Sequence, residues 1–385
     1  MKKVGILTYW TSKDNYGQIL QCYALQQVLI KIGTEPFLIK YLPFKKQRSI
    51  IEKVIKSISI YRIKYYFSKQ HKMEKENALL IKRKYEYITQ KNTIRNFDLF
   101  MNDYIISDKK IYTNIAELKA SAPDADVFVC GSDQVWNNDL TDVNTAGWFL
   151  EFTDKKKISY AASIGRNYTD AEVKLFTQKI KNFNAVSVRE DSAKKLCNRV
   201  GIEAKLVLDP TLLLTSFDYS KIISQIDKKV DVFVYIINIS DFENVYWPNI
   251  RDYINANNFS FAATMSSGYL PAYEGFTGYN MDFPTIQQWL AYIRDSKRVV
   301  TSSFHGVVFS ILFHTEFAVI KLGENFAASN DRISTLLKQL NICDRYVDDS
   351  NISDIFLKKI NWEEVDDRLL ELRFNSLDFI RNNIL

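Results

Sequence analysis

Histidine and cysteine are scarce in this chain, and neither residue type forms a recognisable framework. Only three histidines and four cysteines occur among 385 residues. Cys22, Cys130, Cys197 and Cys343 lie far apart in apolar stretches and include no C-x-x-C pair. This pattern indicates reduced core cysteines rather than a disulfide framework or a zinc site. The scattered histidines likewise make no metal triad, so we expect no metal.

Long apolar runs and glycine-rich phosphate loops are also missing. No apolar run approaches the roughly 20 residues that a membrane helix needs, and the few apolar residues after Lys3 are too short for a signal-peptide core. The 12 glycines contain no G-x-G-x-x-G fingerprint, so a dinucleotide cofactor is not indicated. Hydrophobic residues make up 46% of the chain, which is ample for a core. We therefore expect a soluble, cytoplasmic globular protein.

Positive charge is concentrated in one segment. Residues 45–95 contain 15 Lys and Arg against four Glu, a local balance of +11, whereas the whole chain carries +6. Aromatic and branched residues are interspersed, as in "SIIEKVIKSISIYRIKYYFSKQ". One interpretation is a solvated helical insertion with apolar stripes packed on its domain. Another is a basic, aromatic surface that contacts anionic headgroups at the inner membrane face. No nucleic-acid-binding module accompanies the charge, so nucleic acid is not an expected partner.

Apolar stretches typical of strands alternate with helical segments. They lie at 3–10, 35–42, 125–133, 157–165, 185–191, 204–214, 232–238, 259–264, 298–303 and 316–323. Continuous apolar strands of this kind suit parallel sheets that helices cover on both faces. We predict an α/β fold with two Rossmann-like domains facing each other across a cleft, at residues 1–225 and 226–360. Residues 361–385 are predicted to form a helix.

The turns after the predicted strands are the places to search for a site, because ligands bind at the carboxyl ends of strands in open α/β sheets. After the first strand, "TSKDNYGQ" offers Asp14 or Asn15 as a helix cap and Gly17 as a point of close backbone approach. An ordinary capped helix start is the alternative interpretation.

The turn "CGSDQVWN" at 130–137 places hydrogen-bonding side chains beside an indole. This combination is typical of loops that contact sugars, where polar groups bind hydroxyls and the indole stacks on the ring. A tight turn with a structural tryptophan is the alternative. The candidate acceptor-binding residues are, in this turn and the turn after the first strand, Asn15, Gly17, Gly131, Ser132, Asp133, Trp136 and Asn137.

Two further turns carry groups suited to anions. "AVSVRED" ends in Arg189-Glu190-Asp191, and the Arg189 guanidinium can form two parallel bonds with a carboxylate or phosphate. Without other clues, a surface salt bridge is the favoured explanation of this arginine. In "TSSFHGVVFSILF", the residues Ser303, His305 and Gly306 lie at the expected start of an apolar helix, where free N–H groups bind anions. The helix dipole disfavours a charged histidine unless an anion compensates. A capping histidine without a ligand is the alternative.

Seven blocks together resemble the polysaccharide pyruvyl transferase family. They are "NYGQILQCYALQQVL", "DVFVCGSDQVWN", "ISYAASIG", "VSVRED", "VLDPTLLL", "TSSFHGVVFSILF" and "NDRISTLLKQLNICDRY", in the order and rough spacing of that family, from about residue 4 to 347. The resemblance implies a GT-B-like fold whose C-terminal helix crosses back to the N-terminal domain. It also implies transfer of the enolpyruvyl unit of phosphoenolpyruvate to two hydroxyls of one sugar, which makes a pyruvate ketal and releases phosphate.

The resemblance also implies roles for single residues. His305 and Arg189 match the histidine and arginine that handle phosphoenolpyruvate, and Arg332 in "NDRISTLL" matches a further basic residue associated with that donor. Ser303 and Gly306 would complete the donor site. Family members often carry arginine or asparagine where Phe304 stands here, which puts contacts from that side chain in doubt. The acceptor would lie on the N-terminal domain, and phosphoenolpyruvate on the C-terminal one.

The expected chemistry needs an acid, a base and cations. Addition of a hydroxyl to C2 of phosphoenolpyruvate requires protonation of C3, so we expect His305 to give that proton or else to assist phosphate departure. Arg189 and Arg332 would hold the anions, which makes a metal or other cofactor unnecessary. Glu190, Asp133 and Asp14 are alternatives for the base.

Two other functions fit parts of the sequence. A GT-B glycosyltransferase could cradle the diphosphate of a nucleotide sugar with the same helix end and arginines. A basic scaffold protein would explain residues 45–95 but would leave His305 and Arg189 without a task. For a pyruvyl transferase of capsular, exo- or cell-wall polysaccharide biosynthesis, the acceptor could be free, lipid-linked or polymeric. The basic segment favours a lipid-linked precursor at the membrane.

Overall fold

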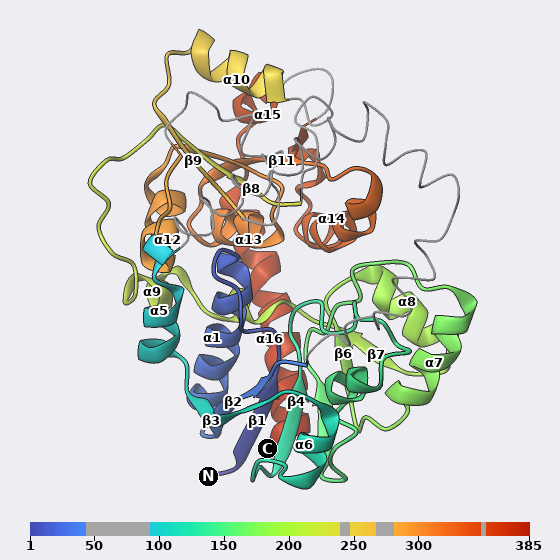
Figure 1. Ribbon diagram of the computed structural model, residues 1–385. Coiled ribbons are helices and arrows are strands. Elements are labelled where there is room, and N and C mark those ends of the chain that lie inside the picture. The colour runs from blue at the N-terminus through green and yellow to red at the C-terminus, as the bar shows by residue number, and fades with distance from the viewer. Residues whose placement is uncertain (44–92, 239–246, 267–280, 348–351) are drawn as a thin grey trace, which may run out of the picture.

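The computed structural model describes residues 1–43, 93–238, 247–266, 281–347 and 352–385 (Figure 1). The basic segment 45–95 lies outside the described residues except for its end, Thr93–Arg95, which forms the 3-10 helix η1. Both interpretations of that segment therefore remain predictions. Within the described ranges, no helix is long and apolar enough to cross a membrane.

The first half of the chain builds a parallel five-stranded sheet in the order β3-β2-β1-β4-β5. Its strands are β1 (Lys3–Leu7), β2 (Glu35–Tyr41), β3 (Ser107–Tyr112), β4 (Val127–Cys130) and β5 (Lys156–Ser159). The central strand β1 is almost wholly buried, as expected for a strand covered on both faces. Beside β5, β6 (Val186–Val188) and β7 (Ala204–Leu206) pair as a separate two-stranded sheet.

The second half repeats the arrangement with the strand order β12-β11-β10-β8-β9, again parallel. The strands are β8 (Val232–Ile236), β9 (Phe261–Met265), β10 (Arg298–Thr301), β11 (Glu316–Ile320) and β12 (Tyr346–Val347). The central strand β10 carries apolar residues that are buried, and it leads directly into the helix that begins at Phe304.

Helices cover both sheets. They are α1 (Tyr16–Lys31), α5 (Phe97–Tyr104), α6 (Ile115–Ala120), α7 (Asp170–Ile180), α8 (Asp191–Arg199), α9 (Ser216–Ser220), α10 (Trp247–Ala256), α12 (Ile286–Asp295), α13 (Phe304–Leu312), α14 (Asn330–Gln339), α15 (Ile352–Leu357) and α16 (Trp362–Ile384). Shorter 3-10 turns are η2 (Val143–Phe149), η3 (Pro210–Leu213), η5 (Glu324–Ser329) and η6 (Cys343–Arg345). Every residue of α13 is buried, so this helix is part of the core rather than a surface helix.

The last helix, α16, crosses from the second domain back to the first (Figure 1). Arg373 on α16 donates hydrogen bonds to the carbonyl oxygens of Leu212 and Leu214. At the end of the helix, Lys2 Nζ lies 3.1 Å from the carbonyl oxygen of Ile384, which brings both termini to one end of the molecule. The predicted fold of two Rossmann-like domains with a returning C-terminal helix is therefore confirmed.

Some local expectations were wrong. The stretch 204–214 is a strand only to Leu206, and Pro210 then opens the 3-10 turn η3. The cysteines of α1, β4 and α8 are buried as expected, but Cys343 is exposed and is not a core residue.

Candidate active site

A small cavity lies between the two domains, where α1 and α13 begin. Its volume is about 120 Å³. It is lined by Tyr9, Asn15, Gln18, Asp133 and Gln134 from the first domain and by Ile237, Asn238, Ser303, Phe304, His305 and Arg332 from the second. Sites for drug-sized ligands occupy about 300–1,000 Å³, so this cavity suits a small metabolite or one end of a larger ligand.

Both helix starts at the cavity are capped by side chains that the sequence supplies locally. Asn15 precedes α1 and its Oδ1 accepts a hydrogen bond from the backbone N–H of Gln18. Ser303 precedes α13 and its Oγ accepts from the backbone N–H of Gly306 at 3.3 Å. The positive ends of two helix dipoles therefore meet at the cavity, which favours a negatively charged ligand.

The two helices touch at Gly17 and His305. A Cβ atom added to Gly17 would lie 1.9 Å from Nδ1 of His305, so a side chain at this position would collide with the ring. Glycine at position 17 thus allows α1 to pack against the imidazole, which is itself almost fully buried. Nε2 of His305 lies 3.7 Å from Oδ1 of Asp209. The ring is held between a helix of the first domain and a buried carboxylate.

A buried ion-pair cluster lies next to this histidine. Nη1 of Arg189 is 2.6 Å from Oδ2 of Asp209, and Nη2 is 3.0 Å from Oδ1 of Asp133. Asp209 also accepts hydrogen bonds from the hydroxyls of Ser132 at 3.1 Å and Thr211 at 2.6 Å. The carboxylate of Asp209 thus links Arg189 to His305, whereas Asp133 links Arg189 to the cavity.

The electrostatics of the cluster are set by burial and by its internal charges. Burial opposes ionisation of Asp209, but the neighbouring His305 ring and the Arg189 guanidinium hold its pKa well below the usual range. Burial raises the pKa of Glu190, against the opposing effect of Arg189. Burial and the like charge of Arg189 lower the pKa of Arg332 to about 10.

Arg332 differs from Arg189 in its partners. Its Nε donates a long hydrogen bond of 3.4 Å to the carbonyl oxygen of Ser329, and among the described residues no carboxylate lies within ion-pair distance of it. Three buried polar atoms nearby lack a hydrogen-bond partner in the described part of the chain: Nε of Arg189, Oε2 of Glu190 and Nε2 of His305. Nε of Arg189 lies 4.0 Å from Oε2 of Glu190, and Nε2 of His305 lies 3.7 Å from Asp209, so these atoms have ion-pair partners beyond hydrogen-bond distance. Because buried polar atoms are normally hydrogen-bonded, the cluster is a candidate functional site.

The comparisons with known proteins show the family of the chain. The family model of polysaccharide pyruvyl transferases matches residues 15–323, which is most of the chain. The chain belongs to the polysaccharide pyruvyl transferase family. No curated protein matches the chain in a sequence search.

Among solved structures, the chain is similar to a UDP-GlcNAc 2-epimerase from Methanocaldococcus jannaschii, at 10% identity and a TM-score of 0.48, over 98% of this chain and 93% of that one. It is also similar to MurG from Acinetobacter baumannii, at 8% identity and a TM-score of 0.44, over 99% of this chain and 100% of that one.

The structure brings most of the candidate residues of this family member together. Asn15, Asp133, Ser303, His305 and Arg332 line the cavity. The other candidates do not line it. Gly17 packs against the ring of His305, and both Ser132 and Arg189 bind Asp209. Gly131 and Gly306 are also outside the lining. Asn137 lies outside the cavity.

Two residues lie differently from what their expected roles require. The side chain of Arg189 is 1% exposed and both its terminal nitrogens are bound by carboxylates, so it does not contact the cavity directly as a donor-holding residue would. Trp136 is fully buried, stacks on Phe149 and donates its indole N–H to the carbonyl oxygen of Trp148. Its ring has no exposed face on which a sugar could stack, and the structural interpretation of this tryptophan replaces the sugar-contact one.

Several site residues were not among the candidates. Asp209 was quoted within a block, "VLDPTLLL", but received no role, although an acid at the end of an apolar strand is a usable signal. Tyr9, Gln18 and Asn238 also line the cavity. They lie in turns or in the first turn of a helix, and nothing local distinguishes them from ordinary polar residues.

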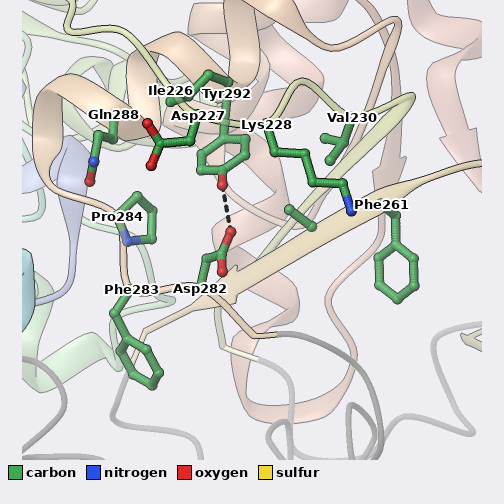
Figure 2. Close-up of a pocket in the computed structure, with 11 residues that line it drawn as sticks. Ile226, Asp227, Lys228, Val230, Phe261, Asp282, Phe283, Pro284, Gln288 and Tyr292 are labelled. Atoms are coloured by element: carbon green, nitrogen blue, oxygen red, sulfur yellow. Dashed lines mark hydrogen bonds between the residues drawn. The ribbon is translucent and has the colours of Figure 1, made fainter.

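A larger cavity of about 360 Å³ lies elsewhere on the second domain, between α12 and the start of β9 (Figure 2). It shares no lining residue with the cavity at His305. Figure 2 shows Tyr292 at its centre with its hydroxyl donating to Asp282, at 2.5 Å. Lys228 lines this cavity together with Asp227 and Asp282, and its side chain extends toward Phe261. The start of α12 borders this cavity, but no arginine or histidine lines it, whereas two helix starts, His305 and Arg332 meet at the smaller cavity. We therefore take the smaller cavity as the candidate site.

Proposed function

We propose that this transferase uses phosphoenolpyruvate as its donor and forms a pyruvate ketal on two hydroxyls of one sugar unit. The observation that carries the proposal is Arg332, a buried cation on the cavity wall with no carboxylate partner among the described residues. It faces a cavity on which two helix starts and His305 converge. Phosphoenolpyruvate brings a phosphate and a carboxylate, which need a cation and backbone N–H donors together.

The charges in the site support an anionic donor over a neutral one. Arg189 is balanced by Asp133 and Asp209, both within ion-pair distance. Arg332 has no carboxylate within ion-pair distance among the described residues. Burial and the like charge of Arg189 lower its pKa, so its surroundings disfavour the charged form. A bound phosphate or carboxylate would stabilise the charged form of Arg332. Part of the binding energy would come from this stabilisation.

The reaction would run in two steps. In the first, a sugar hydroxyl adds to C2 of phosphoenolpyruvate while C3 takes up a proton, so a C–O bond forms as the C=C π bond is lost. In the second, another hydroxyl of the same sugar displaces phosphate from C2 and closes the ketal. His305 would supply the first proton or assist the departure of phosphate. Asp209 would orient the imidazole and stabilise its protonated form, as the acid of a catalytic triad does.

The base and the acceptor side follow from the cavity lining. Of the three alternatives for the base, only Asp133 lines the cavity. The first domain contributes mostly neutral hydrogen-bonding groups there, from Tyr9, Asn15, Gln18 and Gln134. Neutral donors and acceptors suit sugar hydroxyls, so we place the acceptor on this side and the donor beside Arg332. A lipid-linked precursor, held near the membrane by residues 45–95, remains part of this proposal.

A donor comparison tests the proposal. The protein is incubated with a panel of sugar acceptors and either phosphoenolpyruvate or UDP- and GDP-sugars, and products are followed by mass spectrometry and phosphate release. We expect a ketal with stoichiometric phosphate from phosphoenolpyruvate alone, and no ketal with the variant Arg332→Met. Turnover of a nucleotide sugar without turnover of phosphoenolpyruvate would favour the glycosyltransferase alternative.

A further inference from the structure

The start of α8 is capped by side chains from the other domain. Its own N-cap residue, Glu190, makes no capping hydrogen bond. Instead, Oε1 of Glu190 accepts a hydrogen bond from the backbone N–H of Ile164 at 2.8 Å. The other oxygen, Oε2, lies 4.0 Å from Nε of Arg189. The first N–H groups of α8 therefore need acceptors from elsewhere, because they have no partner within the helix.

Those acceptors come from α14. The backbone N–H of Asp191 donates to Oγ1 of Thr335 at 3.1 Å, and the N–H of Ser192 donates to Oδ2 of Asp331 at 2.9 Å. Asp331 and Thr335 are one helical turn apart, so they present a carboxylate and a hydroxyl on the same face of α14. A carboxylate at a helix N-terminus also interacts favourably with the helix dipole.

The position of α14 is fixed at its other side as well. Asn330 accepts a hydrogen bond from the backbone N–H of Leu322 at 2.9 Å and donates one to its carbonyl oxygen at 2.7 Å. Three consecutive residues therefore make different contacts. Asn330 binds α14 to its own domain, Asp331 binds it to α8, and Arg332 lines the cavity.

The same contacts bring two like charges together across the domain boundary. Arg189 immediately precedes the capped start of α8, and Arg332 immediately follows the capping Asp331. Beyond the effect of burial, the mutual repulsion of the two guanidinium groups lowers the pKa of Arg332, and it is partly offset by Asp133, Glu190 and Asp209. A charge-assisted hydrogen bond is among the stronger contacts available to oppose it.

We propose that Asp331 and Thr335 are positioning residues, an interdomain clasp that caps α8 and thereby holds Arg332 at the donor cavity. The clasp itself is independent of the donor's identity. Its effect on phosphoenolpyruvate rests on the proposed function.

The test compares Asp331→Ala and Thr335→Val with the conservative Thr335→Ser. Hydrogen exchange of the peptide spanning residues 189–197 is measured in the free protein, and phosphoenolpyruvate binding is measured by calorimetry. The matched control is Asp170→Ala, which removes an acid from the first turn of α7. That helix carries its own capping box from Thr169 and Glu172, and its exchange should stay unchanged in every variant.

We expect faster exchange at the start of α8 in Asp331→Ala and Thr335→Val, and wild-type behaviour in Thr335→Ser. We also expect the Kd for phosphoenolpyruvate to rise about tenfold, which is about 1.4 kcal/mol, with little change in kcat. Unchanged exchange at α8 would overturn the clasp, and faster exchange with an unchanged Kd would overturn its positioning role. If the wild-type protein failed to bind phosphoenolpyruvate, the proposed function would fail while the exchange result still decided the clasp.

Discussion

Replacement of Arg332 by methionine should make the protein more stable while it destroys the function. Arginine stays protonated at neutral pH, so the folded protein holds a charge that its surroundings disfavour. The lowering of the Arg332 pKa from its usual 12.5 to about 10 corresponds to about 3 kcal/mol. Methionine keeps much of the side chain's length without the charge.

Part of that gain is offset by the lost hydrogen bond from Nε to Ser329, which is worth about 1 kcal/mol. We therefore expect Arg332→Met to raise the free energy of unfolding by about 2 kcal/mol at pH 7. For a protein of this size the melting temperature should rise by roughly 2–3 °C. Saturating phosphoenolpyruvate should stabilise the wild-type protein, by about 2.7 kcal/mol at 100 times its Kd, and should not stabilise the variant.

Urea unfolding and thermal melts with and without phosphoenolpyruvate measure both effects. The matched control is Arg368→Met on the exposed side of α16, where the arginine pairs with Glu364 one turn away. Loss of such a surface pair should change stability by less than about 1 kcal/mol. A loss of more than about 1 kcal/mol in Arg332→Met would refute the reasoning, since it would mean that this cation is well compensated in the free protein.

Three further changes test other parts of the site. Gly17→Ala should lower kcat on the order of 10²-fold because its Cβ displaces the ring of His305, with the circular dichroism spectrum unchanged; near-normal turnover would contradict the packing argument. Asp209→Asn should lose roughly 3–5 kcal/mol in urea unfolding at pH 7, because Arg189 loses a buried partner. Because its pKa is depressed, the Asp209 carboxylate stabilises the folded protein above the ordinary aspartate pKa, and this stabilisation is lost as pH falls. The stability difference between wild type and Asp209→Asn should therefore shrink in acid. A difference that is constant with pH would argue against this. Glu190 has a raised pKa, so its contribution to the free energy of unfolding is complete below the ordinary glutamate pKa and is lost as pH rises. The stability of Glu190→Gln relative to wild type should therefore increase with pH in unfolding measurements. A stability difference that does not change with pH would count against it.

The sequence predicted those features whose causes are local. The strand and helix on either side of Ser303 follow from an apolar run, a capping serine and a second apolar run, and the structure has β10 and α13 there. Strand β3 gave no such signal, because it is an edge strand with mostly exposed polar residues.

The site was only partly predictable, for a physical reason. Arg189 and His305 were named from residue type and turn position, and Arg332 only from the resemblance to the family. The partners of Arg189 and His305 come from distant segments. That Asp133 and Asp209 both bind Arg189 depends on where β4, β6 and β7 end, with β5 lying between β4 and β6. The role of Trp136 could not be predicted either. The sequence does not distinguish a tryptophan that stacks on a sugar from one that is buried in the core, as Trp136 is.

Calorimetric titration of phosphoenolpyruvate is the most direct test of the central claim that the cavity at Arg332 and His305 binds this donor. It would be run on the wild-type protein and on Arg332→Met, with Asp170→Ala as the matched surface control. The account predicts saturable binding to the wild type and the control, and binding that is lost or at least tenfold weaker, by about 1.4 kcal/mol, in Arg332→Met. Equal binding to all three proteins would contradict it, because the donor would then lie elsewhere.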